Sequence, residues 1–392
     1  MGLAACSAGS GKDGGAGGTT GSGGQTGQGG ATATGGTTAS GGTTGTGGTS
    51  ATGGATGTGG TTATGGTGGT TSTPDGSAGG TTRGGGATDV DGGLPPVSSD
   101  GDGNVMIGPT YKQAVEMTYV AGVPKGTVTM FTMKSSDSKI YPGINGAYSR
   151  PVWVYVPKQY VPGTPIPFIL AQDGDNYILR LPPILDNMIN AGRLPVMAAV
   201  MANSGGGNDK GSERGLEYDT VSDKFLSFVE TELLPKVEAT VAVKLTTDPN
   251  GRATMGGSSG GAAAFTLGWF GPDEFRRILT YSGTYVNQES PTDPMYPHGA
   301  WEYHEHLIAD APPKPLRVWL EVGENDYNAN DPETTYENFK MANQRMAAIL
   351  QSKGYHNRFE YALGAMHNDA NVVNQTLPEA LEWLWRGYPI AK

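Results

Sequence analysis

The chain has 392 residues, 65 of them glycine, and its formal net charge is −11 at pH 7. This acidic balance argues against nucleic acid as a partner, because phosphate binding needs clustered Lys and Arg. A single cysteine excludes an internal disulfide framework and paired-cysteine zinc or redox chemistry, and no apolar run reaches the roughly 18 residues that span a bilayer.

The first hundred residues predict a disordered tether. Gly, Thr, Ser and Ala make up most of this segment, which therefore has almost no apolar side chains to offset the loss of chain entropy on folding. The rest of the chain is long enough for one large α/β domain with a sizeable core. We therefore expect a tether over residues 1–100 and a folded domain over residues 105–392.

Cys6 stands in "LAAC", which resembles the lipobox where a bacterial lipoprotein is cut and its new N-terminal cysteine is lipidated. Small residues precede Cys6 and the tether follows it. No charged or apolar export segment precedes Leu3, so we expect the true start to lie further upstream or the signal to be trimmed. The expectation is an exported protein anchored through Cys6 at the bacterial outer membrane or cell surface, or otherwise secreted. The alternative is a chance cysteine in the tail.

Beyond the tether, strand patterns alternate with helical ones. The segment "GTVTMFTMKS" alternates polar and apolar residues and predicts antiparallel edge strands. Further strands are predicted at 150–157, 167–174, 195–203, 252–257, 277–283, 317–323 and 357–364, and helices at 182–192, 223–240, 259–270, 337–354 and 377–388. This order predicts a mainly parallel sheet with helices on both faces and an active site at the carboxyl ends of the strands.

The stretch "RATMGGSSGG", residues 252–261, contains G-x-S-x-G in two overlapping registers, centred on Ser258 and on Ser259. Between a strand and a helix this pattern is typical of a nucleophile elbow, whose sharp turn needs small residues two before and two after the serine. Glycine flanks both serines at those positions. Steric requirements alone therefore permit either serine.

The pattern G-x-S-x-G-G resembles the elbow of enterochelin-esterase-like and feruloyl-esterase-like α/β-hydrolases, the "putative esterase" family. The segments "RGLEYDTVSDKFLSFVETELLPKVE", "LEVGENDYN" and "FEYALGAMHNDA" are also similar to that family's stretches, so the resemblance runs from about residue 120 to 388. It implies an α/β-hydrolase fold and ester hydrolysis through an acyl-enzyme on Ser258, with no metal or organic cofactor. It also implies that Ser259 supplies an oxyanion-hole N–H.

A serine nucleophile needs a base and an orienting acid, which follow it in that fold in the order serine, acid, histidine. His367 falls where the family's base lies, although "AMH" replaces its usual Gly-Gly-His. His356 lies between a predicted helix and strand, which indicates a surface residue. For the acid, the family's Gly-x-x-Asp pattern selects Asp326, with Glu324 and Asp331 as alternatives.

Other residues are candidates for oxyanion and substrate contacts. Gly174 or Asp175, after the strand at 167–174, could supply the second oxyanion N–H, unless "DGDN" is only a turn. The predicted substrate-binding side chains are Tyr177, Arg214, Tyr285, Trp301 and Tyr303. Arg214 could instead pair with Glu217 to brace its loop. The histidines of "WEYHEH" lack the spacing of a metal motif, so we predict no metal site.

The predicted substrate is an acetyl or hydroxycinnamoyl ester of a polysaccharide. A long tether on an exported enzyme suits a bulky substrate, and the acidic domain opposes the approach of an anionic iron–catecholate complex. One alternative is a siderophore trilactone esterase of the enterochelin type. Another is a hydrolase fold without activity that serves as a binding module.

Overall fold

The computed structural model describes residues 100–390. The predicted tether and Cys6 lie outside the described residues, so their expectations stay predictions. In the described part, no helix combines the length and apolar character needed to cross a membrane.

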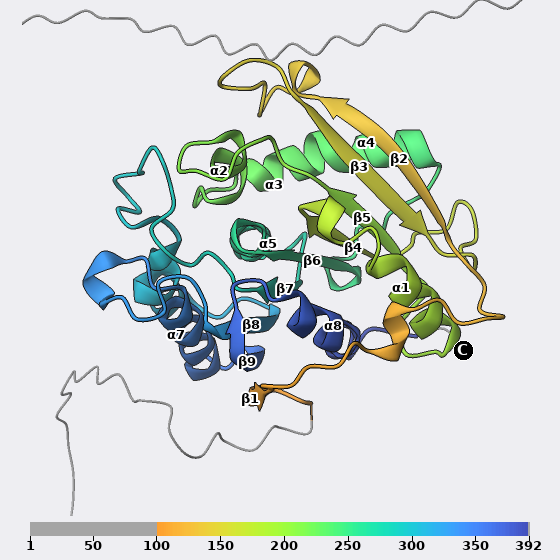
Figure 1. The fold of residues 1–392 in the computed structure, drawn as a ribbon. Helices are drawn as coiled ribbons and strands as arrows, with labels where there is room; N and C mark the ends of the chain where they lie inside the picture. The colour runs from red at the N-terminus through yellow and green to blue at the C-terminus, as the bar shows by residue number, and fades with distance from the viewer. Residues whose placement is uncertain (1–99, 391–392) are drawn as a thin grey trace, which may run out of the picture. The chain divides into compact units, whose positions relative to one another are not determined.

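A nine-stranded sheet forms the centre of the domain (Figure 1). Its strands are β1 (Gly103–Ile107), β2 (Thr127–Lys134), β3 (Ser149–Val156), β4 (Phe168–Gln172), β5 (Ala198–Ala202), β6 (Arg252–Gly257), β7 (Arg277–Tyr281), β8 (Arg317–Asn325) and β9 (His356–Met366). Their order across the sheet is β1-β9-β8-β7-β6-β4-β5-β3-β2. All seven strands predicted from 150 onward are present, because each is a short apolar run with both faces covered.

The sheet is mainly parallel, as predicted. Only β2 and β3 run against their neighbours, β2 on β3 and β3 on β5, and β2 is the antiparallel edge strand predicted from "GTVTMFTMKS". At the opposite edge, β1 lies parallel to β9. The sequence did not predict β1, because its five residues have no alternating pattern and lie next to a glycine-rich segment.

Helices cover both faces of the sheet (Figure 1). On one face, α1 (Leu181–Asn190) and α8 (Ala370–Leu384) pack against a core cluster that includes Ile169, Met255 and Trp319. On the other face lie α2 (Glu213–Tyr218), α3 (Lys224–Phe228), α4 (Leu234–Val241), α5 (Ser259–Phe270), α6 (Ile308–Asp310) and α7 (Phe339–Ser352). The α/β-hydrolase prediction is confirmed at the level of the fold.

The last helix begins earlier than predicted. The sequence placed its start at residue 377, directly before Pro378. In the structure α8 begins at Ala370, capped by the Asp369 carboxylate, which accepts the Asn371 N–H, and Pro378 lies inside it. The predicted helix over 223–240 is likewise present as α3 and α4, joined by one turn of π-helix over Val229–Leu233.

The described residues before 105, where the sequence placed the start of the domain, contact the rest of it. Asp100 contacts three separate parts of the domain: its carboxylate lies 2.8 Å from Arg317 Nη1 and 3.0 Å from His356 Nδ1, and its carbonyl accepts from Arg386. Strand β1 follows at Gly103. Residues 100 to 104, which the sequence left outside the domain, thus make contacts with it.

A truncated chain that begins at residue 98 is expected to fold, whereas one that begins at residue 108 should lose at least about 2 kcal/mol of unfolding free energy. The longer deletion removes β1, exposes the edge of β9 and leaves the buried Arg317 without the Asp100 carboxylate. Urea unfolding followed by circular dichroism measures the difference. Equal midpoints for the two truncated chains would contradict the assignment of β1 to the core.

Candidate active site

Ser258 occupies a strained turn between β6 and α5. Its φ is 56° and its ψ is −129°, a conformation that residues other than glycine rarely adopt. A Cβ on Gly256 would lie 2.3 Å from the carbonyl carbon of Gly260, and one on Gly260 would lie 3.1 Å from Asp173 Oδ2. Cβ atoms on Gly257 and Gly261 would be crowded as well, at 2.6 Å from Asn368 Oδ1 and 3.2 Å from Gly283 Cα, so the glycines fit both registers. The positive φ marks Ser258, not Ser259, as the residue at the strained position of the turn.

The side chain of Ser259 has a different environment from that of Ser258. It is buried, and its hydroxyl hydrogen-bonds the carboxylate of Asp219. Its backbone N–H belongs to the first turn of α5, where amides have no acceptor within the helix and attract negative charge. Ser259 can therefore offer an amide beside Ser258 while its side chain has a separate, structural partner.

The side chains of Ser258, His367 and Asp326 form one hydrogen-bonded chain. The distance from Ser258 Oγ to His367 Nε2 is 2.9 Å, and that from His367 Nδ1 to Asp326 Oδ1 is 2.6 Å. Each is the first residue after a strand, since β6 ends at Gly257, β8 at Asn325 and β9 at Met366. Parallel strands bring these carboxyl ends to one edge of the sheet, which is why residues so distant in sequence meet.

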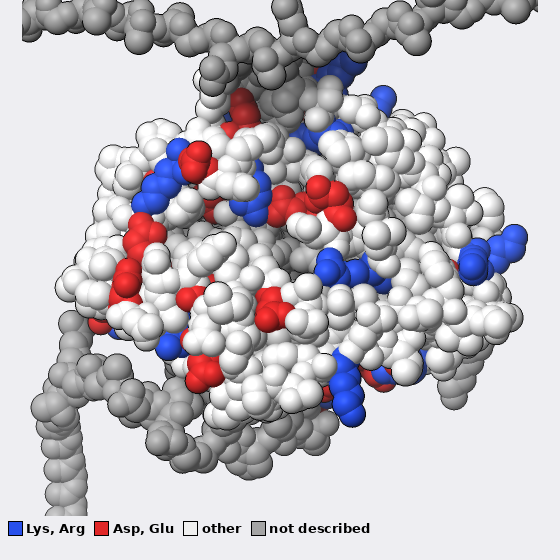
Figure 2. Space-filling model, in the orientation of Figure 1, with Lys and Arg blue, Asp and Glu red and all other residues white. Residues whose placement is uncertain are grey.

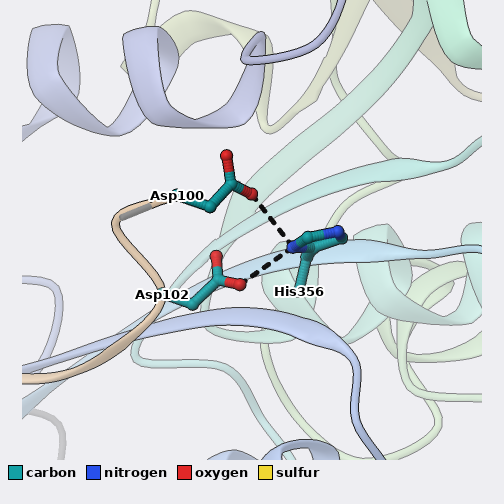
Figure 3. A group of neighbouring side chains, drawn as sticks. All are labelled: Asp100, Asp102 and His356. Carbon is teal, nitrogen blue, oxygen red and sulfur yellow. Dashed lines mark hydrogen bonds and ion pairs between the residues drawn. The ribbon is translucent and has the colours of Figure 1, made fainter. Parts of the chain in front are cut away.

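The alternative acids and the other candidate base have different partners. Glu324 Oε2 accepts the Gly364 N–H at 2.7 Å, which ties β8 to β9. His356 lies at the other end of β9, where its Nδ1 lies 2.8 Å from Asp102 and 3.0 Å from Asp100 (Figure 3). Asp331 has no hydrogen bond or ion pair with His367 in the described part of the chain. Its backbone carbonyl accepts from the Asn338 side chain.

Three side chains around the serine and histidine escaped the sequence analysis. The ring of Tyr327 stacks on His367 with centroids 4.1 Å apart, and Phe339 meets the same ring edge-on at 5.1 Å. Thr284 Oγ1 lies 3.3 Å from Ser258 Oγ. Only Tyr327 carried a signal, because it directly follows Asp326 in the sequence.

A cavity of about 460 Å³ opens onto the serine and histidine. This volume suits a small ligand or one segment of a larger one. Among its described lining residues Arg214 is the only Lys or Arg, and the others include Asn208, Gln288 and Glu337. On the face drawn in Figure 2, acidic and basic side chains are interspersed rather than gathered by sign. Local contacts, not a broad field, therefore decide what binds here.

The loop after β4 contains the two predicted oxyanion donors, Gly174 and Asp175. A Cβ on Gly174 would lie 2.4 Å from the Met201 carbonyl carbon, so this position requires glycine. The Asp175 N–H donates to Asn203 Oδ1 at 3.1 Å, and a role for this amide requires an exchange of that acceptor. Both oxyanion assignments stay predictions.

The ion pair predicted between Arg214 and Glu217 is wrong. Arg214 Nη2 lies 2.7 Å from Asp173 Oδ2, so Arg214 braces the loop after β4 and lines the cavity. Glu217 points to the other side of α2 and pairs with the buried Arg150 at 2.6 Å. Arg214 and Glu217 are three positions apart on a short helix, yet each pairs with a residue from another part of the chain. The spacing in the sequence does not reveal this.

The prediction that four aromatic residues face a substrate is also wrong. Tyr177, Tyr285, Trp301 and Tyr303 are buried. Tyr285 and Tyr303 pack on Phe265 of α5, with centroids 5.8 and 5.0 Å away, and the Tyr303 hydroxyl hydrogen-bonds Thr266. These rings belong to the hydrophobic core because the segments that carry them fold down onto helices instead of rising around the cavity.

Two groups of histidines and acids contain the residue types that bind metal ions. His304 is buried, and burial lowers its pKa to about 3. Its Nε2 hydrogen-bonds the Tyr285 carbonyl, so it serves the core. Within residues 100–390, one group of three ligand-type side chains lies close together: Asp100, Asp102 and His356 (Figure 3). The Arg317 guanidinium, 2.8 Å from Asp100, already supplies a positive charge there.

The carboxyl of Asp219 is expected to make the free energy of unfolding fall as the pH rises. Burial raises its pKa to about 7 against the lowering effects of the Ser259 hydroxyl and Arg214, while Asp173 raises it and Lys210 lowers it. Because the folded-state pKa exceeds the unfolded one, its contribution is complete below the unfolded pKa and is lost as the pH rises through about 7. The variant Asp219→Asn should therefore show a shallower fall.

Urea unfolding at several pH values between about 4 and 8 measures that slope, which lies between the unfolded and the folded pKa. The exposed Asp137, changed to Asn, is the control and should leave the slope unchanged. Parallel slopes in the wild type and Asp219→Asn would refute this assignment.

The comparisons with known proteins identify the family and the fold. A family model described as "Putative esterase" matches residues 147–384. A solved enterobactin esterase from Shigella flexneri is similar at a TM-score of 0.50 and 20% identity, over 68% of this chain and 60% of its own. A ferulic acid esterase from Anaeromyces mucronatus is similar at a TM-score of 0.50 and 18% identity, over 69% of this chain and 94% of its own. A search of curated proteins gave no match.

The chain spans about three fifths of the length of the enterobactin esterases that it matches. At identities this low, the solved structures bear on the fold and not on the substrate.

Proposed function

The chain belongs to the family described as "Putative esterase", and we propose that it is a carboxylic ester hydrolase with Ser258 as its nucleophile. The observation that carries the proposal is the hydrogen-bonded chain from Ser258 Oγ through His367 to Asp326, with distances of 2.9 and 2.6 Å. A serine hydroxyl is a weak nucleophile at its own pKa, and an adjacent imidazole oriented by a carboxylate is the arrangement that activates it.

In the acylation step, Ser258 Oγ attacks the ester carbonyl carbon and its proton passes to His367 Nε2. The Asp326 carboxylate accepts the Nδ1–H, fixes the tautomer and stabilises the imidazolium that forms. The backbone N–H of Ser259, with a second donor from the loop after β4, stabilises the oxyanion. The intermediate collapses when the alcohol oxygen leaves with the proton from Nε2, and the acyl group stays on Ser258.

Deacylation repeats these roles with water. His367 Nε2 takes a proton from a water molecule, whose oxygen attacks the acyl carbon, and the second oxyanion collapses as Ser258 Oγ leaves and regains a proton from Nε2. The carboxylic acid product then dissociates. The stacked Tyr327 and the edge-on Phe339 hold the His367 ring in place in both steps.

For the substrate we propose an acetyl or hydroxycinnamoyl ester of a polysaccharide. Arg214 is the only Lys or Arg among the described residues that line the cavity, and Asp173 neutralises it at 2.7 Å. A strongly anionic siderophore complex would gain little attraction from such a site. Tyr327 is exposed and lines the cavity, so its ring can contact the ring of a substrate.

The test is kcat/KM on methyl ferulate and acetylated xylan beside that on enterobactin. A preference for enterobactin above about tenfold, equivalent to roughly 1.4 kcal/mol of transition-state binding, would replace the polysaccharide proposal with the siderophore one. No turnover of p-nitrophenyl acetate by a folded protein would instead favour the binding module. Ser258→Ala protein is the control for hydrolysis by contaminants.

We also propose that the protein is exported and held at a membrane through lipidated Cys6, on the strength of the "LAAC" motif and the tether that follows it. The protein expressed with an export signal should partition into the detergent phase, and Cys6→Ser should move it to the aqueous phase. Partition that is unaffected by this change would exclude lipidation at Cys6.

A further inference from the structure

A second cavity, of about 600 Å³, lies at the opposite end of the sheet from Ser258. Its walls come from the amino ends of β7, β8 and β9, the loop before β6 and the chain after α8. It shares no residue with the active-site cavity. Its volume falls within the range of small-molecule sites.

Positive charge is concentrated around this cavity, although the chain as a whole carries −11. Among the described residues that line it, Asp100 is the only carboxylate. The cationic lining residues are Arg276, Arg277, Lys314, Arg317 and Arg386. Asp273 lies 3.5 Å from Arg276 but is almost fully exposed, so water screens that pair.

Arg277 is the most informative of these residues. It is 7% exposed, yet it has no ion pair with a carboxylate within residues 100–390. Its guanidinium donates to backbone carbonyls only: Asn250 at 2.6 Å, Arg386 at 3.1 Å and Leu384. Buried charges are ordinarily paired, and carbonyl dipoles offset a full positive charge only in part.

The neighbouring Arg317 increases this surplus of positive charge. Burial and the charge of Arg317 lower the pKa of Arg277 to about 10, while Tyr388 and Asp248 act in the opposite direction. Asp100 cannot compensate Arg277, because its carboxylate is already shared between Arg317 at 2.8 Å and His356 at 3.0 Å. Figure 3 shows Asp100 and Asp102 both directed at His356. Asp102, 3.9 Å from Arg317 Nη2, and Asp248 offset part of this charge. Because no carboxylate among the described residues pairs with Arg277, the cavity favours an anion over a metal ion.

We propose that this cavity binds an anionic ligand through a carboxylate or phosphate group held by Arg277 and the cations at its rim. Guanidinium groups match these anions with paired hydrogen bonds. Tyr355, Pro313 and Pro315 provide apolar walls for a carbon skeleton such as that of a sugar acid or sugar phosphate. The site is separate from the esterase chemistry and does not depend on the proposed substrate.

Calorimetric titration of the full chain with inorganic phosphate and with glucuronate, at constant ionic strength, tests the proposal. At least one anion should bind with a stoichiometry of one, and which one binds identifies the group. The double variant Arg276→Gln/Lys314→Gln should weaken that binding at least tenfold, because both residues line the rim and neither is buried. Turnover of p-nitrophenyl acetate should be unchanged.

The matched control is Lys158→Gln/Lys244→Gln, which removes the same charge from exposed positions elsewhere and should leave the affinity intact. The absence of binding of either anion at about 10 mM, on the scale of weak millimolar sites, would overturn the proposal. It would also be overturned if Arg214→Gln abolished binding and the rim variant did not, since the anion would then occupy the active-site cavity.

Discussion

Ser258→Ala is expected to lower kcat on p-nitrophenyl acetate by at least about 10³- to 10⁴-fold, the scale of the loss of a triad member. The removed oxygen lies 2.9 Å from His367 Nε2, and no other hydroxyl at the turn can replace it. Thr284 Oγ1 is 3.3 Å from Ser258 Oγ, but within residues 100–390 no hydrogen bond joins Thr284 to His367. Steady-state kinetics on protein with a native circular dichroism spectrum measures the loss.

Ser259→Ala is the matched control, because it removes an identical hydroxyl from the next residue. Its backbone N–H remains, so kcat should fall far less than in Ser258→Ala. Loss of the hydrogen bond to the buried Asp219 should appear instead as a lower unfolding midpoint. Equal losses of kcat in the two variants would leave the nucleophile unassigned, and a larger loss in Ser259→Ala would assign it to Ser259 and contradict Ser258.

His367→Ala should reduce kcat about as much as Ser258→Ala, and the double variant should be little worse than either single one. The two groups transfer one proton between them, so the second removal takes away nothing that still functions. Asp326→Asn should also be severe. An amide at 2.6 Å from Nδ1 can present its N–H there, which favours the tautomer that cannot accept the Ser258 proton.

Glu324→Gln is the control for the acid. It is two residues from Asp326 and carries the same charge, but its carboxylate accepts the Gly364 N–H, which an amide oxygen can still accept. Its kcat should remain within about threefold of the wild type, a loss below 1 kcal/mol. If Glu324→Gln were the more damaging of the two, the orienting acid would be Glu324.

The sequence predicted the sheet, and the meeting of Ser258, Asp326 and His367, for one physical reason. Parallel strands with both faces covered are short apolar runs, and their carboxyl ends converge, so residues directly after them can be expected to meet. Ser258, Asp326 and His367 each occupy such a position. The contact that distinguishes Ser258 from Ser259 is its 2.9 Å distance to His367 Nε2, which the pattern of letters does not contain.

Loop residues were predicted less well, because their environment depends on how each loop packs. Trp301 and Tyr303 have the composition of a binding surface, yet the turn that carries them folds onto α5 and buries both. Arg214 pairs with Asp173, which is 41 positions away in the sequence, and not with the nearby Glu217. Tyr327 reaches His367 only because β8 and β9 are neighbours with their ends aligned.

The position of β1 has a mechanical consequence. Strand β1 joins the preceding chain at its amino end and runs parallel to β9, whose carboxyl end leads to His367. If the chain before residue 100 is held fixed while an immobile substrate holds the active site, the pulling force acts along the strands. The hydrogen bonds between β1 and β9 are then loaded together in shear instead of opening one at a time. This attachment can therefore bear tension while the triad residues keep their separations.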